Sequence, residues 1–154
     1  MGFPPEGART PSAESNRAAK LARVTARTAH AVLVVRGSDC LGWRQYGSPA
    51  ELPRIKHRKA YEAGAGAPPD WRITCFFVDR AARGQGVAEA ALRGALALIR
   101  AAGGGTVEAM PEDATGRKTP GAFLWGGELG MFERAGFERV RPLGKSSWPV
   151  RAVP

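Results

Sequence analysis

The stretch of the sequence best suited to chemistry is a glycine-rich loop between an aromatic, β-branched run and an apolar helix. The run ends at Val78, glycines follow at Gly84 and Gly86, and helical periodicity begins at Val87. A helix that starts directly after such a loop points unpaired backbone N–H groups and the positive end of its dipole at one spot. Glycine has no side chain that would prevent an anion from approaching the backbone. The segment therefore predicts a phosphate-binding loop.

Three kinds of phosphate loop can be compared with this segment. A P-loop ends in Gly-Lys-Ser/Thr, which the segment lacks. A dinucleotide fingerprint requires Gly-x-Gly-x-x-Gly/Ala, and Glu89 stands at its third small position. The pattern Gln/Arg-x-x-Gly-x-Gly/Ala is matched by Arg83, Gly86 and Ala88. An ordinary glycine-rich turn without a ligand is the alternative.

The third pattern resembles the cofactor loop of the GNAT superfamily of N-acetyltransferases. In that superfamily the loop joins the fourth strand to the third helix, and an apolar residue stands five positions before the arginine, as Val78 does. Met131–Phe137 resembles the superfamily's Leu-Tyr-Glu-Lys-x-Gly-Phe signature. Further segments within about residues 16–150 are similar to an actinobacterial subgroup: Gly42-Trp43, Cys75–Val78 and Glu108–Pro111.

The resemblance implies an enzyme that transfers the acetyl group of acetyl-CoA to a primary amine by direct attack. The pyrophosphate would lie on the loop, and a backbone N–H of Phe76–Val78 would polarise the thioester carbonyl. Phe132 stands where many relatives have a tyrosine that protonates the departing thiolate, and it has no proton to give. The expected cofactor contacts are Phe76, Phe77, Val78, Arg83, Gly84, Gln85, Gly86, Val87, Ala88 and Phe132.

The attacking amine must lose a proton to a carboxylate or to water. Glu108, on the strand expected after the loop's helix, is the first candidate for this base, and a salt-bridged strand residue is its alternative role. Asp79 follows the cofactor strand and has a loop cap as its alternative, and Glu128 is the third candidate. Aromatic residues that either line an acceptor pocket or pack in the core are Trp43, Tyr46, Trp71 and Trp125.

Periodicity outlines the elements that must position these residues. We expect helices over Glu14 to about Ala26, part of Arg54–Glu62, Val87 to about Ala102, and about Phe123–Ala135. Strands are expected at Ala31–Val35, Cys40–Tyr46, Trp71–Val78, Thr106–Met110, Phe137–Arg141 and Ser147–Val150. This order predicts an α/β fold with a mixed, mostly antiparallel twisted sheet flanked by helices. Residues 1–14 are expected to form a flexible tail and residues 15–154 a single domain, in which the first GNAT strand is missing or displaced.

The chain carries 23 Lys and Arg against 14 Asp and Glu, a formal net charge of +9. That charge suits a polyphosphate cofactor, and a solvated basic face is the alternative. No recognition motif supports nucleic-acid binding, and no run of 18 apolar residues supports a membrane span. Two cysteines and no secretory leader pattern predict a cytoplasmic protein without a metal site. A non-catalytic acyl-CoA-binding module is the alternative function, and a homodimer is left open.

Overall fold

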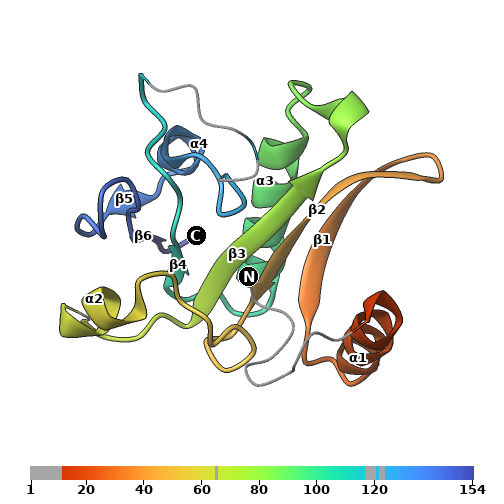
Figure 1. Ribbon diagram of the computed structural model, residues 1–154, viewed down its shortest axis with the longest axis horizontal. Helices are drawn as coiled ribbons and strands as arrows, with labels where there is room; N and C mark the ends of the chain where they lie inside the picture. The colour runs from red at the N-terminus through yellow and green to blue at the C-terminus, as the bar shows by residue number, and fades with distance from the viewer. Residues whose placement is uncertain (1–11, 65, 117–120, 122–123) are drawn as a thin grey trace.

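The computed structural model describes residues 12–64, 66–116, 121 and 124–154 (Figure 1). Its elements are α1 (Ala13–Thr25), β1 (His30–Arg36), β2 (Asp39–Gly47), α2 (Arg58–Ala63), β3 (Trp71–Val78), the 3-10 turn η1 (Arg80–Ala82), α3 (Val87–Ala101), β4 (Val107–Ala109), α4 (Leu129–Arg134), β5 (Glu138–Arg139) and β6 (Val150–Ala152). The strands form one sheet in the order β1-β2-β3-β4-β6-β5, in which β3 and β4 are parallel and the other neighbours antiparallel. The predicted mixed, mostly antiparallel sheet is confirmed.

β1 and β2 form the predicted hairpin at one edge of the sheet. Their register pairs His30 with Tyr46 and Arg36 with Asp39. Gly37, in the connecting turn, has φ +59°, a left-handed conformation that glycine adopts at little cost. Among the residues that the structure describes, no strand precedes β1, which is therefore the edge of this sheet.

Helix α1 begins slightly before its predicted start. Ser12 is its N-cap, and the Ser12 hydroxyl oxygen accepts a hydrogen bond from the Ser15 N–H at 3.1 Å. Because of this cap, the helix begins at Ala13, inside the segment predicted as a tail. The helix buries none of its side chains, in keeping with the few large apolar residues in its sequence.

Helix α3 packs on β1 and β2 at positions that lack side chains. A Cβ atom at Gly94 would lie 2.9 Å from Cγ1 of Val32, and one at Gly42 would lie 2.9 Å from Cγ1 of Val87. Carbon atoms in contact are normally about 3.5–4.0 Å apart. Glycine at these two positions therefore lets the helix and the sheet approach this closely.

The core lies between this sheet, α3 and α4. α3 buries Leu92, Leu96 and Ile99 at the predicted helical spacing. It ends at the predicted glycine run, where the Gly104 N–H donates to the Ile99 carbonyl at 2.9 Å. No described helix, including this one of 15 residues, is long and apolar enough to cross a bilayer. The core cluster comprises Tyr46, Ile73, Leu92, Ala95, Leu96, Ile99, Val107, Ala109, Leu129, Met131, Phe132, Phe137 and Val150.

Three predicted elements differ from the structure. The helix expected over about Phe123–Ala135 is only α4, because a turn precedes it in which Gly127 has φ +96°; positions 122 and 123 lie outside the described residues. The last strand begins at Val150 instead of Ser147, since Pro149 has no N–H to donate to the ladder. The strand predicted over Phe137–Arg141 pairs only at Glu138 and Arg139, because its partner β6 is itself short.

Candidate functional site

β3 and β4 pair briefly and then separate. Their parallel pairing ends at Ile73 and Ala109, and β3 continues alone to Val78. Figure 1 shows the chain after β4 running away from β3. The turn before α4 takes the place of β4 there, because the Phe76 N–H donates to the Trp125 carbonyl at 3.0 Å. The sheet is thus opened at the parallel junction between β3 and β4.

Two cavities lie at this opening. The larger has a volume of about 800 Å³ and extends from the glycine-rich loop along the end of β3 to α4. The smaller has a volume of about 30 Å³ and lies between β3, β4 and the segment before α2. Trp125 lines both cavities. We call them the cleft and the inner cavity.

The cleft brings together most of the predicted cofactor residues. Those that line it are Phe76, Phe77, Val78, Arg83, Gly84, Gly86, Val87 and Ala88. The Gln85 side chain instead donates to the Ala81 carbonyl at 2.8 Å and accepts from Arg36, so it fastens the loop. Phe132 is fully buried and packs edge-on against Phe137, with ring centroids 5.1 Å apart. It belongs to the core cluster and does not line the cleft.

The loop presents backbone donors to the cleft. Gly84 and Gly86 have φ values of +73° and +76°, and Gly86 is the N-cap of α3. The first hydrogen bond of the helix joins the Ala90 N–H to the Gly86 carbonyl at 2.9 Å. The N–H groups of Val87, Ala88 and Glu89 precede that bond and lie at the positive end of the helix. This is the arrangement that anions bind in proteins.

Arg134, which was not predicted as a site residue, lines the cleft from α4. Its guanidinium donates to the carboxylate of Glu89 at 2.6 Å, and this hydrogen bond lowers the pKa of Glu89. The pair joins α4 to the first turn of α3. Arg134 lies inside the second signature, Met131–Phe137, and this was the sequence signal that could have identified it.

Arg44 is a buried cation behind the cleft that was likewise not predicted. Its side chain is fully buried, and its guanidinium lies 4.9 Å from the ring centre of Phe76 and 4.6 Å from that of Phe132. Nη2 donates to the Gly126 carbonyl at 3.4 Å, while Nε and Nη1 have no hydrogen-bond partner in the structure. Burial lowers the pKa of Arg44 to about 9. Two aromatic faces thus stabilise a charge that water does not reach.

Glu108, the first candidate base, lies on the wall of the inner cavity and is 1% exposed. Its carboxylate accepts from the Tyr61 hydroxyl at 2.8 Å and from Nε and Nη2 of Arg151 at 3.0 and 2.8 Å. Arg72 forms a further ion pair at 3.8 Å. Burial, together with the hydrogen bond to Glu108, raises the pKa of Tyr61. These contacts favour the alternative role of Glu108, a salt-bridged strand residue.

The other two candidate bases lie elsewhere. Asp79 caps η1, where its Oδ1 accepts from the Ala81 N–H at 2.8 Å. Glu128 is exposed and lines the cleft. Of the four candidate aromatic residues, Trp125 lines the cleft and the inner cavity, whereas Tyr46 packs near Trp71 with ring centroids 6.2 Å apart.

Comparison with known proteins finds likeness in structure alone. No protein-family model and no curated protein matches the sequence. An N-acetyltransferase from Staphylococcus aureus matches with a TM-score of 0.58 and 14% identity over 94% of this chain and 79% of its own. A structure described as a GNAT-family acetyltransferase from Desulfovibrio desulfuricans matches with a TM-score of 0.57 and 19% identity, over 96% of this chain and 86% of its own. An acetyltransferase from Thermus thermophilus matches with a TM-score of 0.51 and 16% identity, over 96% of this chain and 79% of its own. The likeness establishes the fold, which is the GNAT fold.

The burial of Arg44 predicts an unusual pH dependence of stability. Below pH 9 the guanidinium is charged in both the folded and the unfolded protein, so the folded state bears its whole desolvation cost. Above pH 9 the folded protein loses this proton before the unfolded protein does, which relieves that cost. Arg44→Met should therefore raise the free energy of unfolding at neutral pH by about 1–4 kcal/mol, and this gain should shrink above pH 9. Chemical denaturation of both proteins across this range measures it. A variant that is less stable at neutral pH would contradict the prediction.

The contacts of Glu108 predict a structural penalty when its charge is removed. Glu108→Gln leaves Arg72 and Arg151 without their buried partner and should lower the free energy of unfolding by about 3–5 kcal/mol. We expect the lower part of that range because the Arg151 side chain keeps 25% of its exposure. Glu128→Gln, an equal change at an exposed position, is the matched control and should leave stability nearly unchanged. Equal denaturation midpoints for the two variants would refute a structural role for Glu108.

Proposed function

We propose that the protein is an acetyl-CoA-dependent N-acetyltransferase that acetylates a primary amine. The observation that carries the proposal is the continuous cleft of about 800 Å³ between the amide-rich loop at Gly84–Val87 and Trp125 at the opening of the sheet. An elongated cofactor with phosphates at one end and a thioester at the other suits such a cleft. The GNAT fold supports this assignment. The actinobacterial subgroup, a cytoplasmic location and the oligomeric state remain predictions.

The loop would hold the cofactor's pyrophosphate. Its N–H groups and the α3 dipole favour negative charge, and Arg83 adds a cationic side chain to the same cleft, where the charge of Arg134 is paired with Glu89. The net charge of +9 strengthens the attraction over a longer range. These contacts supply binding energy distant from the reacting atoms, which fixes the thioester in place.

The end of β3 would hold the thioester. The Phe76 N–H points from the free edge of the strand, and the Val78 N–H, two residues further, projects from the same edge. Because the Phe76 N–H already donates to the Trp125 carbonyl, the Val78 N–H is the donor for the thioester carbonyl. A carbonyl that accepts this N–H becomes more electrophilic, and the oxyanion that forms during attack gains more from the hydrogen bond. The charge of Arg44, next to Phe76, adds positive potential there.

The reaction would form a C–N bond and break the C–S bond of the thioester. The neutral amine attacks the carbonyl carbon, the tetrahedral intermediate expels the CoA thiolate, and the nitrogen gives up a proton. Water protonates the thiolate, and the proton released by the amine neutralises the hydroxide that this leaves. Phe132 has no proton to donate, so the thiolate takes its proton from water. Glu128 is the candidate base that faces the cleft with its carboxylate exposed, and we assign the amine proton to it, directly or through water.

A non-catalytic acyl-CoA-binding module is the second candidate. Phe132 favours it, and so does the Phe76 N–H, an expected carbonyl donor that already donates to Trp125. Release of free CoA thiol from acetyl-CoA in the presence of a panel of amines separates the two. The enzyme releases thiol only when an amine is added, and the module releases none.

Acetyl-CoA should raise the melting temperature of the protein, because it binds the folded state. Gly86→Asp should abolish that rise, since it places a carboxylate at the pyrophosphate position. The space beside Gly86 is open and its φ is +76°, so the folded variant is strained but not blocked. Differential scanning fluorimetry with and without acetyl-CoA measures the effect.

Gly103→Asp is the matched control for this variant. Gly103 also has a positive φ and open space around it, but it lies at the opposite end of α3. Its variant should keep the full shift in melting temperature. If a folded Gly86→Asp protein kept an unchanged shift in melting temperature, the cofactor would not bind at this loop.

A further inference from the structure

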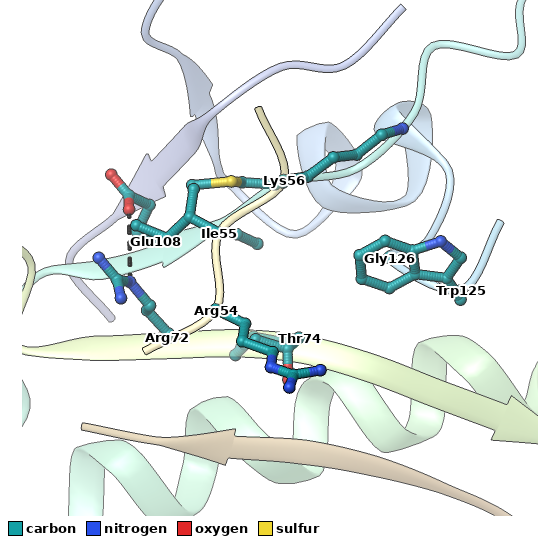
Figure 2. A pocket seen from close by; sticks show the side chains of 11 residues that line it. Arg54, Ile55, Lys56, Arg72, Thr74, Glu108, Trp125 and Gly126 are labelled. Carbon is teal, nitrogen blue, oxygen red and sulfur yellow. Dashed lines mark ion pairs between the residues drawn. The ribbon is translucent and has the colours of Figure 1, made fainter. Parts of the chain in front are cut away.

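The inner cavity contains an unusual group of unpaired polar atoms (Figure 2). In the described part of the chain, six buried side-chain nitrogen and oxygen atoms lack a hydrogen-bond partner. Three of them belong to residues that line this cavity, namely Arg54 Nε, Arg72 Nε and Thr74 Oγ1. Arg72 Nε still forms an ion pair with Glu108 at 3.8 Å, so the atoms in need of a partner are Arg54 Nε and Thr74 Oγ1. Because unpaired buried polar groups cost free energy, such a group indicates a missing partner.

The charges around the cavity favour an anion as that partner. Arg54, Lys56 and Arg72 line it against one carboxylate, that of Glu108. Lys56 is paired with Glu112, and in Figure 2 its side chain extends away from Arg72 and Glu108. The ion pairs found among the described residues do not include Arg54. A cationic fork with an unpaired N–H is therefore available at the wall of the cavity.

The size of the cavity limits the anion. The inner cavity, of about 30 Å³, is far smaller than the cleft, of about 800 Å³, so it favours an anionic group with few atoms. A carboxylate, with two oxygens, suits this small space better than a phosphate with four. Ile55, Met110 and Trp125 supply apolar wall for the carbon that bears the carboxylate. A planar carboxylate also matches the fork of an arginine.

We propose that the inner cavity binds the carboxylate of the acetyl acceptor, so that the acceptor is a small amino carboxylate. The proposal rests on the proposed acetyltransferase function and names its substrate class. Trp125 lines both this cavity and the cleft, so the two adjoin at its side chain, and an amine attached to a carboxylate held by Arg54 and Thr74 would lie towards the opening of the sheet. Arg72, held by Glu108 and by the Leu52 carbonyl at 3.0 Å, keeps its position as the opposite wall.

The test compares matched pairs of acceptors. Glycine and β-alanine are each assayed against the corresponding amide, glycinamide and β-alaninamide, with release of CoA thiol as the readout. The acids should be acetylated with kcat/KM about ten- to hundredfold above the amides, the range that a charge-assisted hydrogen bond supplies. Arg54→Met should erase this preference by raising KM for the acids, while the shift in melting temperature with acetyl-CoA is unchanged. Lys59→Met, an equal loss of charge at an exposed residue of the neighbouring helix α2, should keep the preference.

Thr74→Val provides a second variant if Arg54→Met does not fold. It removes the unpaired hydroxyl with little change in shape, and it should also weaken the preference for acids. Equal use of acids and amides by the wild-type protein, or an unchanged preference in a folded Arg54→Met protein, overturns the proposal.

If acetyl-CoA binds but no amine is acetylated, the proposed function fails and the site is judged by binding alone. N-acetylglycine is then titrated calorimetrically. Binding that Arg54→Met removes and Lys59→Met preserves supports the carboxylate site. No binding at millimolar concentration overturns it.

Discussion

The short pairing of β3 with β4 is the constraint on which the rest of the structure depends. β4 has three residues and β3 has eight, so the longer strand presents a free edge beyond their last pair. A parallel sheet loses backbone hydrogen bonds when it opens in this way. The turn around Trp125 compensates by accepting the Phe76 N–H. The cleft and the inner cavity lie next to that turn because β3 and β4 are not paired beyond Ile73 and Ala109.

The two sides of the opening differ in how they hold charge. Behind the cleft, Arg44 has aromatic rings and one carbonyl as neighbours, and burial lowers its pKa. At the inner cavity, Glu108 is enclosed by Arg72 and Arg151, which leaves Arg54 as the unpaired cation of the lining. Both arrangements place positive potential close to the point where a thioester would be attacked. A polyanionic cofactor and an anionic acceptor are the ligands that would benefit from it.

Local signals in the sequence predicted the part of the site made by one continuous segment. The strand at Trp71–Val78, the glycine-rich loop and helix α3 follow one another, and their apolar spacing and glycines report directly on their conformation. The turn before α4 was missed because contacts distant in the sequence hold it. Arg44, for example, donates to Gly126, which lies 82 positions later in the chain. No spacing rule states that an arginine on a strand will be buried between two rings, and the same holds for the cavity beside Arg54.

The most direct measurement of the central claim is a crystal structure of the protein with acetyl-CoA bound. We predict that the pyrophosphate oxygens accept hydrogen bonds from the N–H groups of the loop and first helical turn, Gly84–Glu89, and that the thioester lies beside Trp125 at the end of β3. A pyrophosphate held instead by the basic segment around Arg54–Lys59, or a thioester away from the opening between β3 and β4, would contradict this placement.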